Sequence, residues 1–301
     1  MQTLQVNAYA KINAYLEITG QREDGYHTIL SHMQAVTLHD TLKLTWDEDA
    51  AAPFSICLTT SDLSLACDDT NLVCRAARAF ANAAKDNGIS VGGALTVYLQ
   101  KDIPMAAGLA GGSADAAAVL RGMNELFHHP FRTQELCEIA VKLGADVPFC
   151  VCSAEQTAMT ARGIGELLTP APALPPDTWM VIACHGEGVL TPWAYRRLDE
   201  LGKPNVQQTE RAYADYLSAL ECGDLDMLAV CAHNCFERVV LSEREAVPML
   251  IDEMVRHGAV FARMSGSGPS VVGFFKDEEG AALCAEYLRA EKVNAHVCRA
   301  L

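Results

Sequence analysis

The sequence predicts an α+β protein with two lobes. Three observations support this prediction: strand-like and helix-like segments interleave along the chain, a glycine-rich turn joins an alternating strand to an alanine-rich helix, and a proline-rich segment divides the chain. Residues 170–176 contain four prolines in seven positions, which opposes both a helix and a central strand. We therefore expect an N-terminal lobe over residues 1–169 and a C-terminal lobe over residues 170–301.

The first half of the chain contains four segments with the period of a β-strand. They cover about residues 6–19, 28–37, 41–46 and 94–100. Three helices are also expected, because apolar residues recur there at helical spacing between cap signals. The first is capped by Asn71 and ends at Gly88, the second runs from Ser113 to about Phe127, and the third opens at Thr133 and closes at Gly144.

The second half of the chain continues this alternation. A buried strand is expected over residues 179–184, followed by a helix that Thr191 caps and that has Pro192 at its first position. Further helices follow, one of them ending at Gly258. The pattern is completed by strands over 260–264 and 271–275, a helix over 278–288 and a last strand near 293–298.

Composition and charge narrow the class of protein. The chain has 301 residues, 50% hydrophobic and 20% charged, which is typical of a globular protein with a full core. Its formal net charge of −15 argues against nucleic acid or an anionic membrane as a partner, because both select for basic surfaces. No apolar stretch approaches the roughly 18 residues that cross a bilayer, and the N-terminus lacks a secretion signal. We therefore expect a cytoplasmic protein.

The cysteines do not follow a metal-binding pattern. Neither Cys150 and Cys152 nor Cys231 and Cys235 have zinc-site spacing, and no matching second pair follows. Without an export signal, the 12 cysteines are expected to be reduced thiols used as small core residues.

The most informative segment is the glycine-rich loop over residues 104–114. Small residues let the backbone approach a ligand, and the free amides and the dipole of the helix that follows attract anions such as di- and triphosphates. A Walker-type loop is absent, since Gly202-Lys203 is followed by Pro204, and the glycine spacing does not fit a dinucleotide fold. The alternative is a small-residue turn packed between strand and helix without a ligand. The loop consists of Pro104, Met105, Ala106, Ala107, Gly108, Leu109, Ala110, Gly111, Gly112, Ser113 and Ala114.

Three motifs in this order along the chain resemble the superfamily of galactokinase, homoserine kinase, mevalonate kinase and phosphomevalonate kinase. They are Ala10-Lys11-Ile12-Asn13, the glycine-rich loop, and Met264-Ser265-Gly266-Ser267-Gly268-Pro269-Ser270. The resemblance implies a two-lobed small-molecule kinase fold with a ferredoxin-like C-terminal lobe. It also implies that ATP, with Mg²⁺, places its phosphates on the loop, where Ser113 offers a hydroxyl to phosphate or metal. The loop departs from some relatives in having alanine instead of glycine at positions 106, 107 and 110, which would stiffen it.

Three further segments resemble the branch of this superfamily that acts on a cytidine diphosphate sugar alcohol in the non-mevalonate route to isoprenoids. They are Gly20–His27, Gly144–Phe149 and Ala161–Glu166. One alternative is a sister kinase acting on homoserine, mevalonate or phosphomevalonate, small acids that need no pyrimidine pocket. Another is a non-catalytic nucleotide-binding relative. The sequence leaves the oligomeric state open.

The resemblance implies that Asp146 is the general base and that Lys11 is the cation close to it. Phosphoryl transfer needs positioning, charge neutralisation and a group that orients or deprotonates the attacking hydroxyl. A neighbouring cation would keep the carboxylate ionised and lower the pKa of that hydroxyl. Asn13 would contact the substrate through its amide. The alternatives are that Asp146 only caps a helix ahead of Pro148 and that Lys11 is a surface residue of an edge strand.

Contacts with the substrate are expected from Tyr26, His27 and Thr191. The resemblance implies that Tyr26 stacks on the pyrimidine and that His27 hydrogen-bonds its polar edge. Asp24-Gly25 is a strong turn signal, so the alternative is a plain hairpin carrying two exposed rings. Thr191 belongs to a segment, residues 187–192, that matches the family only approximately.

Overall fold

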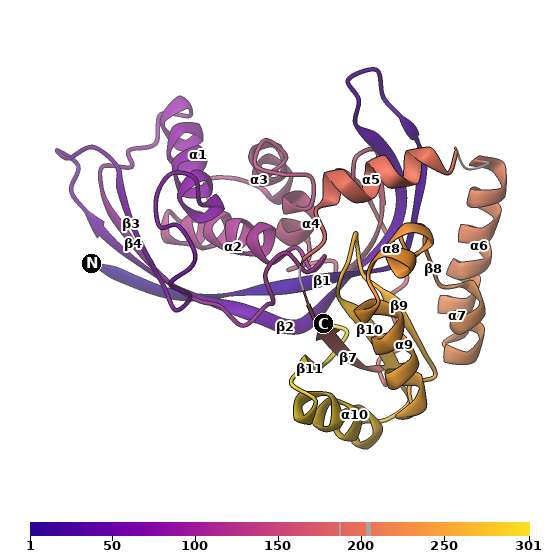
Figure 1. The fold of residues 1–301 in the computed structure, drawn as a ribbon. Helices are drawn as coiled ribbons and strands as arrows, with labels where there is room; N and C mark the ends of the chain where they lie inside the picture. Colours follow the sequence, from indigo (N-terminus) through magenta and orange to yellow (C-terminus); the bar gives the residue numbers. More distant parts are fainter. Residues whose placement is uncertain (187, 203–205) are drawn as a thin grey trace. The chain divides into compact units, whose positions relative to one another are not determined.

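The computed structural model describes residues 1–186, 188–202 and 206–301, so position 187, Lys203 and Pro204 of the segments considered above lie outside the described residues. The chain forms two compact units that interleave along the sequence. Unit 1 consists of residues 1–10, 39–103 and 110–155, and unit 2 of residues 11–38, 104–109 and 156–301. The long strands β1 (Gln2–Gln21) and β2 (His27–Glu48) each contribute to both units (Figure 1). The boundary at residue 169 therefore stays a prediction.

Unit 1 packs helices on a sheet with the strand order β3-β4-β2-β1. β3 (Ser55–Thr60) is parallel to β4 (Gly93–Gln100), and β4 is antiparallel to β2. Asn71 caps α1 as predicted, its side chain accepting the Val73 N–H. Phe80, Val97 and Leu120 lie in the core. The helices are α1 (Leu72–Asp86), α2 (Gly111–Leu126), α3 (Thr133–Ala140) and α4 (Val147–Cys152).

Unit 2 contains a sheet with the order β11-β7-β10-β9, in which all neighbours are antiparallel. Helices follow its first strand, a hairpin joins the second and third, and α10 (Glu278–Ala290) precedes the last. This 4-1-3-2 order of a βαββαβ chain confirms the predicted ferredoxin-like lobe. The strands are β7 (Trp179–Cys184), β9 (Phe261–Met264), β10 (Val271–Phe275) and β11 (Asn294–Arg299).

The remaining strands of unit 2 belong to the same sheet as β1 and β2, and its remaining helices follow β7. The first half of β2 pairs with β5, β5 pairs with β6, and the second half of β1 pairs in parallel with β8. These strands are β5 (Ala158–Arg162), β6 (Leu167–Pro170) and β8 (His233–Asn234). The helices are α5 (Thr191–Glu200), α6 (Val206–Cys222), α7 (Leu225–Cys231), α8 (Glu237–Glu243) and α9 (Ala246–Arg256).

Several predicted boundaries were wrong. The two strands expected over 28–37 and 41–46 are one continuous strand, because the polar break at Asp40 is buried and hydrogen-bonded, and β3 was not predicted at all. α3 begins at Thr133 as predicted but ends at Ala140 rather than at Gly144, and the Glu135 carboxylate accepts the N–H of the preceding Arg132 at 2.8 Å. Thr191 is the first residue of α5, and Leu190 occupies the cap position.

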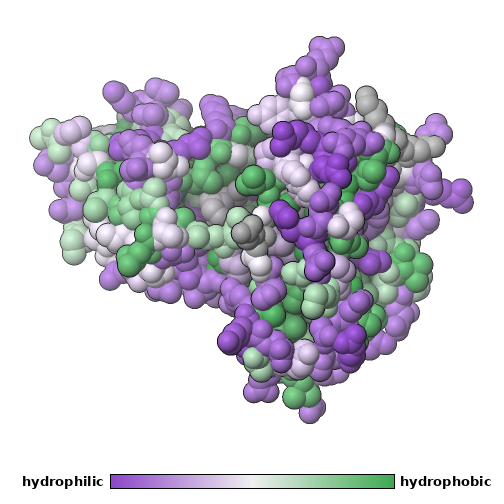
Figure 2. Space-filling view, in the orientation of Figure 1, coloured by the Kyte–Doolittle hydropathy of each residue, from purple (hydrophilic) through white to green (hydrophobic). Residues whose placement is uncertain are grey.

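The surface and the cysteines agree partly with the sequence predictions. Hydrophilic and hydrophobic residues are mixed over the face shown in Figure 2. Among the described residues, no helix has the length and apolarity needed to span a membrane.

The 12 cysteines are free, and 5 of them are buried. The core assignment was wrong for Cys57, Cys67 and Cys222, which are exposed.

Candidate active site

The side chains of Lys11 and Asn13 form a buried pair on β1 in unit 2. Lys11 Nζ donates to Asn13 Oδ1 at 2.6 Å, and the two residues are 4% and 5% exposed. Residues two apart on a strand share a face, so the pair follows from the sequence spacing. Asn13 Nδ2 donates to Ser31 Oγ at 2.8 Å, and this hydroxyl donates to the Tyr15 carbonyl at 2.7 Å. Lys11 is therefore not a surface residue, and its ammonium is held by an oriented amide.

The first half of the glycine-rich loop contacts the serine-glycine turn that follows β9 within unit 2. Ser265 Oγ donates to the Gly108 carbonyl at 3.2 Å, and the Asn13 N–H donates to Ser265 Oγ at 3.2 Å. The Lys11 N–H donates to the Leu109 carbonyl at 3.1 Å. These hydrogen bonds connect parts of all three kinase-like motifs, which are separated by up to 252 residues in the sequence.

The backbone of this part of the loop leaves little room for side chains. Gly108 has φ +77°, and a Cβ atom there would lie 2.2 Å from the Ser265 carbonyl oxygen. Only glycine fits such a close approach. Ala106 nevertheless has φ +50°, a left-handed conformation that costs a residue with a Cβ about 1 kcal/mol. The loop is thus held in a strained conformation at Ala106 and in close backbone contact at Gly108.

The second half of the loop opens α2 in unit 1. Ala110 is the N-cap with φ +57°, and its methyl group cannot cap the helix. The backbone N–H groups of Gly111, Gly112 and Ser113 belong to the first turn, where no intrahelical acceptor exists. The first turn contains no acidic side chain. Free amides and the positive end of the helix dipole therefore favour a phosphate group at this position.

Asp146 occupies the N-cap of α4 in unit 1, as predicted for a helix start ahead of Pro148. Its side chain makes no capping hydrogen bond, and the helix begins with Val147. The alternative that Asp146 serves only as a cap is therefore not supported. The carboxylate stands at the start of a short, buried helix.

The Gly20–His27 segment forms the predicted turn but separates its two rings. The Arg22 N–H donates to the Tyr26 carbonyl at 2.7 Å, and Gly25 has φ +87°. Tyr26 is 62% exposed. The His27 ring instead stacks on Tyr195, with centroids 4.6 Å apart and an interplanar angle of 19°. The segment is thus a hairpin with one exposed ring and one packed ring.

Helix α5 carries two residues that the sequence predictions missed, Tyr195 and Asp199. His27 Nε2 lies 2.7 Å from Asp199 Oδ1, so α5 contacts the histidine through both its ring face and its edge. Thr191 Oγ1 lies 2.9 Å from Ser267 Oγ in the serine-glycine turn. Positions 191, 195 and 199 recur every four residues and share one helical face. This spacing is the signal that could have identified Tyr195 and Asp199.

Asn234 on β8 is a further residue that was missed. Its side-chain amide donates to the carbonyls of Met264 and Gly266 at 2.7 and 2.9 Å, and the residue is 2% exposed. These bonds hold the start of the serine-glycine turn. An isolated asparagine gives no sequence signal for this role, because its partners are 30 residues or more away.

Comparison with known families agrees with this geometry and defines the class. The GHMP kinases N terminal domain matches residues 71–154, which include the whole glycine-rich loop and Asp146. The GHMP kinases C terminal domain matches residues 216–294, which include the serine-glycine turn. The protein is therefore a small-molecule kinase of the GHMP class, and as such an ATP-dependent phosphotransferase.

Individual relatives define the family more narrowly. The chain is 37% identical over 280 residues to a 4-diphosphocytidyl-2-C-methyl-D-erythritol kinase of Alkaliphilus metalliredigens, covering 92% of this chain and 89% of the relative. It is 38% identical over 298 residues to that of Symbiobacterium thermophilum, covering 99% and 100%. The chain belongs to the 4-diphosphocytidyl-2-C-methyl-D-erythritol kinase family.

Solved structures support the fold. A crystal structure of 4-(cytidine 5′-diphospho)-2C-methyl-D-erythritol kinase superimposes with a TM-score of 0.78 at 29% identity, covering 98% of both chains. Homoserine kinase from Cytophaga hutchinsonii gives a TM-score of 0.75 at 16% identity, covering 99% of this chain and 94% of that one. The second likeness concerns the fold alone.

Proposed function

We propose that the protein transfers the γ-phosphoryl group of ATP to the 2-hydroxyl of 4-diphosphocytidyl-2-C-methyl-D-erythritol. The products are ADP and the 2-phosphate, a step of the non-mevalonate route to isoprenoid precursors. The proposal is carried by the identity of 37% to 38% with kinases named for this substrate, over nearly the full chain. We also propose a cytoplasmic location, and the net charge of −15 suits an enzyme that binds small molecules rather than nucleic acid.

In this proposal Asp146 accepts the proton of the substrate's 2-hydroxyl. The hydroxyl oxygen bonds to the γ-phosphorus of ATP as the bond between that phosphorus and ADP breaks. Support comes from the place of Asp146 at the start of α4, where its side chain is not used as a cap. Lys11 supplies the positive charge that favours the alkoxide and the transferring phosphoryl group. Its burial strengthens this effect, and Asn13 keeps the ammonium in place. Asn13 also offers its amide to the substrate.

The phosphates of ATP are assigned to residues 104–114. Support comes from the free amides at the start of α2 and from the close approach of backbone at Gly108. No cluster of three or more His, Cys, Asp or Glu side chains within the described ranges is arranged to hold a metal ion. Ser113, a hard oxygen donor, is the loop side chain suited to hold the Mg²⁺ that accompanies ATP. Mg²⁺ there would neutralise charge that develops on the phosphates.

The cytidine end is assigned to Tyr26 and His27. Tyr26 is exposed and therefore accessible to a base, and ring stacking would contribute about 1 kcal/mol. His27 is held against Tyr195 and Asp199, so its orientation is fixed before a base binds. Thr191 is held next to the serine-glycine turn by Ser267 and is a further candidate for a substrate contact.

The test is ADP release from Mg-ATP with each of three acceptors: the cytidine diphosphate methylerythritol, homoserine and mevalonate. We expect turnover only with the cytidine compound, and a product whose mass has grown by one phosphoryl group. Turnover with homoserine or mevalonate would keep the kinase class and overturn the assigned substrate. ATP binding without turnover on any acceptor would favour a non-catalytic relative.

A further inference from the structure

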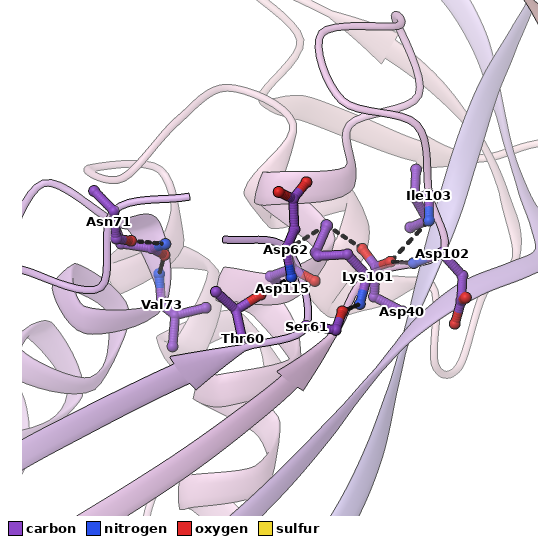
Figure 3. Close-up of polar contacts among 11 residues, drawn as sticks. Asp40, Thr60, Ser61, Asp62, Asn71, Val73, Lys101, Asp102, Ile103 and Asp115 are labelled. Atoms are coloured by element: carbon purple, nitrogen blue, oxygen red, sulfur yellow. Dashed lines mark hydrogen bonds and ion pairs between the residues drawn. The ribbon is translucent and has the colours of Figure 1, made fainter. Parts of the chain in front are cut away.

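A buried cluster of three charged side chains lies in unit 1, next to the glycine-rich loop but outside it (Figure 3). Lys101 Nζ contacts Asp40 Oδ2 and lies 2.8 Å from Asp115 Oδ2. The side chains are 7%, 0% and 5% exposed for Lys101, Asp40 and Asp115. The cluster thus holds one cation between two carboxylates, almost without contact with water.

The two carboxylates of the cluster differ in how well their oxygens are hydrogen-bonded. Asp40 is fully satisfied, because Oδ1 also accepts the N–H groups of Asp102 and Ile103 at 2.6 and 2.8 Å. Asp115 Oδ1, by contrast, is buried without a hydrogen-bond partner among the described residues. Burial raises the pKa of the Asp115 carboxyl, against the attraction of Lys101. Such a group is costly in free energy, since a buried ion cluster is often no more stable than apolar side chains of the same size.

The three side chains join the two segments that flank the loop. Through Asp40 and Lys101 the cluster fixes residues 101–103, directly before Pro104, and the Lys101 N–H also donates to Ser61 Oγ at 2.9 Å. Through Asp115 it fixes the first turns of α2, directly after the loop. The ends of the loop are therefore held at one separation by hydrogen bonds to a single ammonium group.

The ammonium group also lies directly against the loop backbone. A Cβ atom at Gly111, the first residue of α2, would be 3.5 Å from Lys101 Nζ and 3.1 Å from Ile103 Cγ2. The ammonium thus braces the start of α2, while its charge is offset by the two carboxylates that it contacts. A purely apolar core at this place would fill space but would not supply the directional hydrogen bonds.

We propose that Asp40, Lys101 and Asp115 are positioning residues for the phosphates of ATP. They act by fixing the two ends of the glycine-rich loop and by bracing the backbone at Gly111. The inference rests on the proposed function, in that residues 104–114 are taken to bind ATP. It predicts that loosening the cluster weakens ATP binding and leaves the affinity for the acceptor unchanged.

The test compares Asp115→Ala with Asp115→Asn. Alanine removes the bond between α2 and Lys101, whereas asparagine keeps an oxygen that accepts from the ammonium. We expect Asp115→Ala to raise the Kd for Mg-ATP, measured by calorimetry without acceptor, about tenfold, which corresponds to about 1.4 kcal/mol. Asp115→Asn should stay within about threefold of the wild type. In turnover, the KM for ATP should rise in the alanine variant while the KM for the cytidine compound stays constant.

The matched control is Asn124→Ala on the same helix. Asn124 is buried and makes two hydrogen bonds with the Phe131 backbone, so its loss should lower the melting temperature without changing the Kd for Mg-ATP. If Asp115→Ala does not fold, Asp115→Ser replaces it, because a serine hydroxyl can bond to the carbonyl four residues earlier. A variant that is less stable but binds Mg-ATP as the wild type does would show a structural role only and overturn the proposal. Failure of the wild type to phosphorylate the cytidine compound would instead overturn the proposed function. The comparison of Kd values for Mg-ATP would still decide whether the cluster positions the phosphates.

Discussion

The replacement Gly108→Ala tests whether the close contact between the glycine-rich loop and the serine-glycine turn is needed for ATP binding. The added Cβ would lie 2.2 Å from the Ser265 carbonyl oxygen and 3.2 Å from its carbon. Both neighbours are backbone atoms, so no side-chain rotation can relieve the overlap. Either the loop or the turn must move by about 1 Å, given that non-bonded carbon atoms approach to about 3.5 Å.

Gly88→Ala is a matched control, because it separates the conformational cost from the overlap. Gly88 has φ +76°, nearly the same as φ +77° at Gly108, but a Cβ atom there would have nothing within 4 Å. Both replacements cost about 1 kcal/mol for the left-handed conformation. Gly108→Ala should cost a further 1 to 3 kcal/mol, roughly the range for an overpacked site.

The assay is urea denaturation of both variants, followed by the KM for ATP. We expect Gly108→Ala to lose more stability than Gly88→Ala and to raise the KM for ATP at least tenfold, because the phosphate-binding backbone is displaced. Equal losses of stability, with an unchanged KM for ATP in both variants, would refute the close contact and its role.

Three other predictions concern different parts of the molecule. Burial lowers the pKa of His32 from the ordinary 6.5 to about 4, so the folded state should lose about 3 kcal/mol of stability as the pH falls from 6.5 through 4. Urea denaturation should show that the free energy of unfolding falls less over this pH range in His32→Gln, and an equal fall in both proteins would contradict this. Tyr195→Ala should raise the KM for the cytidine compound several-fold, which corresponds to about 1 kcal/mol, because the stack on His27 is lost, while the KM for ATP stays constant. A change in the KM for ATP alone would contradict this role of Tyr195. The oxidant diamide should form a disulfide between Cys137 and Cys152, whose sulfur atoms lie 3.3 Å apart. Mass spectrometry should then show a mass lower by two hydrogens, and the same decrease in Cys137→Ser would exclude this pair.

Much of the fold could be predicted from the sequence, because it is encoded by local patterns. The alternation of Leu95, Val97 and Leu99 marks β4, and Asn71 marks the start of α1. The edge strand β3 was missed because it is only six residues long and its alternation depends on Ile56 and Leu58 alone. The break expected in β2 was wrong because the sequence does not show that Asp40 is buried and paired.

The motifs of the candidate site could also be predicted, but their contacts with residues distant in the sequence could not. Lys11 and Asn13 are two residues apart on one strand, so their pairing is a local consequence of strand geometry. Asn234 and Lys101 depend on partners that are distant in sequence, and a single polar residue carries no sign of such partners. The roles of Asp146 and Tyr26 stay predictions until they are measured.

The most direct test of the central claim is kcat for ADP release from saturating Mg-ATP and the cytidine diphosphate methylerythritol, in the wild type and in Asp146→Asn. The variant keeps the size of the side chain and removes its ability to accept the proton. The account predicts turnover in the wild type and a kcat lower by about 10² to 10⁴ in the variant, with the Kd for Mg-ATP unchanged. A kcat within tenfold of the wild type would contradict the role of Asp146, and no turnover in the wild type would contradict the proposed reaction.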